Sequence, residues 1–111
     1  MKLTELQLAY LRTMHYDMGL FPDAKPILSG KIIGHIVCYF GTDYTDSLCE
    51  MIDQFYALAQ PWRIQEPLIK CFGNIGAENL NDFDWSGAAS PAFTEARLTD
   101  AGVKYIKEYD I

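Results

Sequence analysis

Hydrophobic residues near the start of the chain recur at the spacing of an α-helix. Within residues 4–18 they line one side of such a helix, a set made up of Leu6, Tyr10, Leu11, Met14 and Met18. Thr4 and Gln7 have the spacing of an N-terminal capping box, and Gly19 fits the position after a helix end. The pattern therefore predicts a first helix over 4–18, followed by a turn-rich connector over 20–26.

The clearest helical pattern covers residues 47–59. Ser47 and Glu50 again have capping-box spacing, and Pro61 ends the run. One face of this predicted helix is apolar and consists of Leu48, Met51, Ile52, Phe55 and Ala59.

Residues 30–40 fit two patterns. Their β-branched and aromatic side chains favour a strand. The same segment also has apolar residues at helical spacing, namely Ile32, Ile33, Ile36, Val37 and Phe40, and Ser29 is placed to cap such a helix. The residues alone leave both alternatives open.

The second half of the chain indicates two short strands and a last helix. Residues 67–72 form a short apolar run, and 73–90 are rich in Gly, Asn, Asp and Ser, as loops are. Residues 92–98 alternate with a period of two, and Thr99 is placed to cap a helix that ends near Tyr109. The resulting order of elements is that of a winged helix, so we expect an α+β fold in one domain over 1–111.

Composition narrows the classes of function. The 111 residues carry a net charge of −6, and half are hydrophobic, so we expect a folded chain with little affinity for nucleic acid as a whole. No apolar run reaches the roughly 18 residues that a membrane span needs, which predicts no membrane association and a cytoplasmic protein. The three cysteines form no C-x-x-C motif and have apolar neighbours, which predicts packed thiols without disulfide, metal or cofactor.

Five segments, in this order, resemble the winged-helix DNA-breakage module of type IIA topoisomerases, the group of the gyrase A and topoisomerase IV C subunits. They are MHYDMGLFPDAKP, SGKIIGHIV, MIDQFYALAQ, KCFGNIGA and AFTEARLT, and the resemblance as a whole runs over roughly residues 8–105. The last two resemble the family patterns G-x-G-N-F-G-S and R-Y-T-E-A-R-L-S. The resemblance implies a helix over 30–40 and a set of scaffold residues: Gly73, Asn74, Gly76, Thr94, Glu95 and Arg97.

The chain departs from this family where the chemistry takes place. The family's tyrosine attacks a DNA phosphate, and the preceding arginine helps to hold that phosphate. Here these positions are Phe93, which has no hydroxyl, and Ala92, which has no charge. The stretch FGTDYTD over 40–46 also lacks the family's histidine. We therefore expect no catalytic residues and no enzyme activity.

Charge on the third helix argues against DNA as its partner. Residues 41–60 contain four acidic residues and no Lys or Arg, and the family's arginine in this helix falls on Ala57. In the family, the second and third helices lie at the DNA gate, where two subunits meet. The resemblance thus implies a candidate partner or DNA-gate surface formed by Lys31, His35, Asp46, Glu50 and Asp53.

The sequence leaves two classes of function open. One is an inactive topoisomerase-like protein that binds or modulates gyrase or topoisomerase IV subunits, with a homodimer as an alternative assembly and at most weak DNA binding. The other is a small DNA-binding regulator, because RLTDAGVKYI also resembles the start of the last helix in MarR-like winged-helix regulators.

Overall fold

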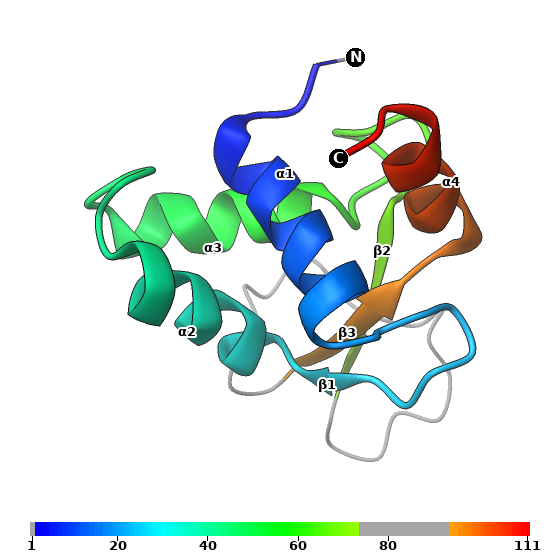
Figure 1. The fold of residues 1–111 in the computed structure, drawn as a ribbon, viewed down its shortest axis with the longest axis horizontal. Coiled ribbons are helices and arrows are strands. Elements are labelled where there is room, and N and C mark those ends of the chain that lie inside the picture. The colour runs from blue at the N-terminus through cyan, green and yellow to red at the C-terminus, as the bar shows by residue number, and fades with distance from the viewer. Residues whose placement is uncertain (1, 74–93) are drawn as a thin grey trace.

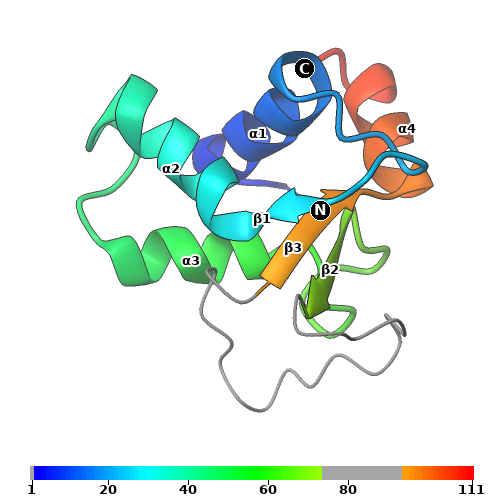
Figure 2. The ribbon, with the colours of Figure 1, turned by 90° about the horizontal axis from the view of Figure 1, so that it is seen from below.

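The structure, a computed structural model, describes residues 2–73 and 94–111. Helix α1 lies centrally, packs against the other three helices, and continues into the π-helical turn η1, which contacts the sheet (Figures 1 and 2). This arrangement confirms the α+β prediction. In chain order the elements are α1 (Glu5–Arg12), η1 (Thr13–Asp17), β1 (Ile27–Leu28), α2 (Ser29–Phe40), α3 (Leu48–Ala57), β2 (Ile69–Gly73), β3 (Thr94–Leu98) and α4 (Asp100–Glu108).

Helix α1 begins as its sequence predicts and ends differently. The Thr4 hydroxyl accepts a hydrogen bond from the Gln7 amide at 3.1 Å, and the Gln7 side chain accepts one from the Thr4 amide at 3.0 Å. These two bonds complete the capping box. The predicted last turn is the wider η1, in which the Met18 amide donates to the Thr13 carbonyl at 3.0 Å. Gly19 follows with a φ of +60°, which favours glycine.

The ambiguous segment 30–40 is helix α2, as the family resemblance implies. Its Ile32, Ile33 and Ile36 are buried in the core, so helical packing outweighs the strand preference of β-branched residues. The expected Ser29 cap is wrong. Leu28 occupies the N-cap position without a side-chain cap, and Ser29 is the first helical residue.

Helix α3 has half of its predicted capping box. The Ser47 hydroxyl accepts from the Glu50 amide at 3.2 Å, as expected. The Ser47 amide, however, donates to the Thr45 hydroxyl at 3.1 Å, and that hydroxyl in turn donates to the Glu50 carboxylate at 3.2 Å. Thr45 thus connects the two ends of the box. At its inner face, α3 is joined to α1 by Tyr10, whose hydroxyl donates to the Met51 carbonyl at 3.1 Å.

The sheet is antiparallel with the strand order β1-β3-β2. Strand β3 alternates as predicted, with Thr94, Ala96 and Leu98 buried. Strand β1 was not foreseen, because two residues are too short to show a period. Ala96 lies opposite both Ile27 on β1 and Cys71 on β2, which places the middle of β3 at the centre of the sheet.

Thr99 and Gly102 fix the start of α4 against the strand before it. The Thr99 hydroxyl accepts from the Gly102 amide at 3.0 Å, as predicted, and donates to the Pro67 carbonyl at 2.7 Å. Gly102 lies so close to Leu68 that a Cβ on residue 102 would overlap the Leu68 carbonyl oxygen. Only glycine therefore allows α4 to sit at this distance.

The structure modifies the prediction for the cysteines. Cys71 is buried in the sheet, whereas Cys38 near the end of α2 and Cys49 near the start of α3 are exposed. In the described part of the chain, no group of three or more metal-ligating side chains is placed to hold an ion. No described helix is both long and apolar enough to span a bilayer.

Two glycine substitutions test the close contact at α4. We expect Gly102→Ala to lower the free energy of unfolding by about 1–3 kcal/mol, because the new methyl group is forced against the Leu68 carbonyl. Gly34→Ala is the matched control, since a Cβ there meets no atom within 4 Å in mid-helix. It should raise stability by about 0.5–1 kcal/mol. Urea denaturation measures both, and a neutral or stabilising Gly102→Ala would contradict the packing described.

Candidate functional site

A chain of buried hydroxyl groups connects the candidate active-site strand to two helices. Thr94, the first residue of β3, is fully buried, as is Ser29 at the start of α2. The Thr94 hydroxyl donates to Ser29 Oγ at 2.8 Å. It also shares a 3.0 Å hydrogen bond with the hydroxyl of Tyr56 on α3. Because a threonine hydroxyl has one proton, Tyr56 is the donor in the second bond.

Tyr56 is hydrogen-bonded to the first residue of β3, and its surroundings make it a poor nucleophile. Burial raises the pKa of its phenol, and the hydrogen bond to Thr94 only partly offsets that effect. A phenol must lose its proton to attack a phosphorus atom efficiently. The hydroxyl chain therefore serves to hold α2, α3 and β3 together.

The other described scaffold residues lie on the sheet. Gly73 is opposite Thr94 in the register, and Glu95 and Arg97 alternate outward from the buried face. The Arg97 guanidinium donates to the Ala24 carbonyl at 2.9 Å and lies 5.1 Å from the centre of the Phe72 ring. These contacts give Arg97 a structural role. The predicted positions Asn74, Gly76, Ala92 and Phe93 lie outside the described residues.

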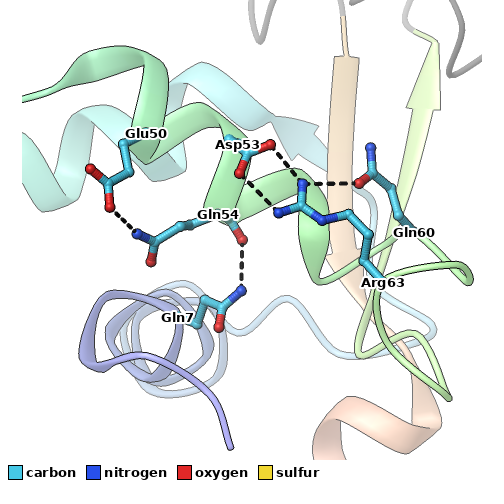
Figure 3. A network of polar contacts seen from close by, with 6 residues as sticks. All are labelled: Gln7, Glu50, Asp53, Gln54, Gln60 and Arg63. Atoms are coloured by element: carbon cyan, nitrogen blue, oxygen red, sulfur yellow. Dashed lines mark hydrogen bonds and ion pairs between the residues drawn. The ribbon is translucent and has the colours of Figure 1, made fainter.

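The acidic side chains of α3 differ in how their charge is balanced (Figure 3). Arg63, which lies beyond the end of α3, folds back and binds the Asp53 carboxylate through both terminal nitrogens, at 2.6 and 2.9 Å. Glu50 instead accepts from the uncharged Gln54 side chain at 3.0 Å. Across residues 2–73 and 94–111, no Lys or Arg forms an ion pair with Asp43, Asp46 or Glu50. Three of the four carboxylates in residues 41–60 thus have no cationic partner in the described part of the chain.

The five predicted surface residues lie on α2 and α3 or just before α3, and among the described residues no ion pair joins any two of them. Lys31 and Asp46 are exposed. His35 points to Asp17 of η1, with 3.4 Å between His35 Nε2 and a carboxylate oxygen. Asp53 is held by Arg63, which the sequence pattern does not reveal because the arginine follows the Pro61 turn, ten residues away.

Comparison of the sequence with known proteins finds relatives of this chain. The A subunit of DNA topoisomerase 4 from Neisseria gonorrhoeae is 36% identical over 83 residues, which is 75% of this chain and 10% of the relative. The DNA gyrase A subunit of Mycolicibacterium smegmatis is 30% identical over 95 residues, or 86% of this chain and 10% of the relative. The chain is a type IIA topoisomerase A-subunit-like domain.

Other comparisons fit this assignment. The DNA gyrase A subunit of Mycobacterium tuberculosis strain H37Rv is 28% identical over 95 residues, again 86% of the chain and 10% of the relative. No family model matches the sequence. The A-subunit-like domain spans about a tenth of the length of the curated relatives it matches. Within it, α3 is the third α-helix of a winged-helix order, the helix that such folds present to DNA.

Replacing the central hydroxyl tests the buried chain. Thr94→Val keeps the shape and removes the hydrogen bonds to Ser29 and Tyr56, so we expect a loss of about 1–3 kcal/mol in unfolding free energy. Thr42→Val, at an exposed position, is the control and should change stability by less than about 0.5 kcal/mol. Thermal and urea unfolding measure both, and equal effects would show that the hydroxyl chain is unimportant.

The pair between Arg63 and Asp53 predicts a pH-dependent effect. The hydrogen bond from Arg63 lowers the pKa of Asp53, so the folded state favours the carboxylate. This stabilisation is present above the unfolded pKa of about 3.9 and is lost as pH falls through the lower folded pKa. Arg63→Gln should raise the Asp53 pKa and cost less than about 1 kcal/mol at pH 7, because both groups are largely exposed.

NMR titration of the Asp53 carboxyl group measures this shift. Arg12→Gln removes the same charge from α1 and should leave the Asp53 pKa unchanged. Well below the folded pKa of Asp53, the stability difference between Arg63→Gln and the unaltered protein should disappear. An Asp53 pKa that is the same in both variants would contradict the paired geometry.

Proposed function

We propose that this A-subunit-like domain is catalytically inactive and acts by binding another protein, one of the subunits of gyrase or topoisomerase IV. The observation that carries the proposal is the charge of α3 and the residues leading into it. Glu50 and Asp53 lie on the helix that winged-helix proteins present to DNA, and Asp43 and Asp46 lie in the segment before it. Of these four carboxylates, only Asp53 has a cationic partner among the described residues.

The first argument concerns chemistry. The family's nucleophile position holds Phe93, which has no oxygen to attack a phosphate, and Ala92 cannot clamp one. Tyr56, whose hydroxyl is bonded to Thr94 on β3, has a raised pKa. These features support a domain that keeps the scaffold without the cleavage reaction.

The second argument concerns electrostatics. Affinity for duplex DNA comes largely from Lys and Arg side chains that neutralise phosphates. The segment 41–60 offers none, and the Arg63 that approaches it is occupied by Asp53. A DNA backbone brought to this helix would meet Asp43, Asp46 and Glu50, so a partner with positive charge fits the face better.

The third argument concerns apolar exposure. Four large hydrophobic side chains are exposed at the end of α2 and the start of α3, namely Val37, Tyr39, Phe40 and Leu48. Leu48 is 60% exposed although it belongs to the apolar face predicted for its helix. Apolar side chains beside uncompensated charge are typical of protein-binding surfaces. The family resemblance implies a contact between subunits at these same two helices.

Binding to the purified A subunits of gyrase and topoisomerase IV tests the proposal directly. We expect a dissociation constant of about 1 µM or tighter for at least one of them, and altered DNA supercoiling when the domain is present. Replacing Asp43, Asp46 and Glu50 by Asn, Asn and Gln should slow association about tenfold or more at low salt. No covalent DNA adduct should form.

A second triple variant serves as the matched control. Asp23→Asn, Glu66→Gln and Glu108→Gln remove the same number of charges from exposed positions outside α3 and should leave association nearly unchanged. Equal effects of both triple variants, or binding to neither topoisomerase, would overturn the proposal. Salt-dependent binding to duplex DNA in a gel shift would instead favour the winged-helix regulator class.

A further inference from the structure

A groove of about 540 Å³ lies between η1 and the second half of α2. Its lining consists of Tyr16, Asp17, His35, Tyr39 and Phe40. Three of these are exposed aromatic rings, with exposed fractions of 63% for Tyr16, 73% for Tyr39 and 37% for Phe40. None of the lining residues is Lys or Arg, so the only permanent charge in the groove is the Asp17 carboxylate.

Contacts beside and within the groove hold its side chains in place. The Tyr16 hydroxyl donates to the Ile111 carbonyl at 2.9 Å, and its ring packs edge-on against His15 with 4.4 Å between centroids. On the opposite side, the Tyr39 ring lies against His35, again with 4.4 Å between centroids and 31° between planes. The groove is therefore largely formed before any ligand binds, which lowers the entropic cost of binding.

We propose that this groove binds a cationic side chain, arginine in particular, supplied by a partner protein. The faces of aromatic rings attract cations, and a planar guanidinium both stacks on tyrosine and forms paired hydrogen bonds with a carboxylate. The groove offers both kinds of contact together, the rings of Tyr16 and Tyr39 and the side chain of Asp17.

Other ligand classes fit the lining less well. An anion would be repelled by Asp17, and a purely apolar group would remove water from that carboxylate without replacing its hydrogen bonds. A metal ion needs more ligands than Asp17 and His35 provide, and the described residues contain no larger metal-ligating group there. A cationic side chain is the ligand that satisfies both the rings and the carboxylate.

This inference deepens the proposed function by naming the chemistry of one partner contact, and it rests on that proposal only for the source of the arginine. A net charge of −6 on this chain makes a basic partner segment the better source than a second copy. The groove itself can be tested without any topoisomerase present.

The test is an NMR titration of the full chain with the peptide acetyl-Gly-Arg-Gly-amide. We expect saturable shifts at Tyr16, Asp17 and Tyr39, with a dissociation constant no tighter than about 1 mM, because a single side chain makes few contacts in a solvent-exposed groove. The same peptide with citrulline, a neutral analogue of arginine, should bind at least about fivefold more weakly. Asp17→Asn and Tyr39→Ala should each weaken arginine binding by about two- to fivefold.

Two control variants separate the groove from general surface effects. Asp23→Asn removes an exposed carboxylate elsewhere, and Tyr109→Ala removes a tyrosine that is 60% exposed and lies just after α4. Both should bind the arginine peptide as the unaltered chain does. Equal binding of arginine and citrulline peptides, unsaturable shifts, or control variants as weak as the groove variants would each overturn the inference.

The outcomes also distinguish this inference from the proposed function. If the chain binds the arginine peptide but neither topoisomerase, the groove is an arginine site and the proposed partner is wrong. Concentration-dependent self-association that the arginine peptide abolishes would identify a second copy as the source and overturn the assignment to a partner protein.

Discussion

The hydroxyl of Thr94 is the constraint on which the arrangement of the other elements depends. It is fully buried, and its two hydrogen bonds join the strand to two helices. One bond is to Ser29 on α2, and the other is to Tyr56 on α3. A buried hydroxyl without partners is unfavourable, so the strand and both helices are held at hydrogen-bonding distance. Apolar packing alone permits small sliding between layers, whereas these bonds specify one relative position. Helix α3, which carries Glu50 and Asp53, and helix α2, which forms one side of the groove, are both fixed in this way.

Few acidic side chains in the described part of the chain have a basic partner. Among the described residues, Asp53 forms an ion pair with Arg63, and Asp17 lies 3.4 Å from the imidazole of His35. The remaining carboxylates in that part of the chain contribute to a field that reaches into the solvent. That field has a range of about 10 Å at moderate ionic strength, so it acts on an approaching partner before contact. Buried hydroxyls and apolar side chains therefore stabilise the fold. In the proposed function, the carboxylates attract the partner.

Local features of the fold could be predicted from the sequence, and long-range ones could not. The caps at Thr4, Ser47 and Thr99 were predictable because each depends on residues within three positions. The same rule failed at Ser29, because its hydroxyl bonds to a strand 65 residues away. The partner of Asp53 and the pairing of β1 were missed for the same reason. Each depends on residues that lie apart in the sequence and are brought together by the fold. The acidic character of α3 was visible at once, whereas the groove, assembled from η1 and α2, was not.

The π-helical turn has a consequence for how this surface tolerates change in chain length. A residue advances an α-helix by roughly 100°, so the extra residue that a π-turn accommodates rotates everything after it by about that angle. Tyr16 and Asp17 belong to this turn and line the groove beside α2. Deleting one residue from the turn would change the rotation of Asp17 relative to α1, so the spacing of this segment matters as much as its composition.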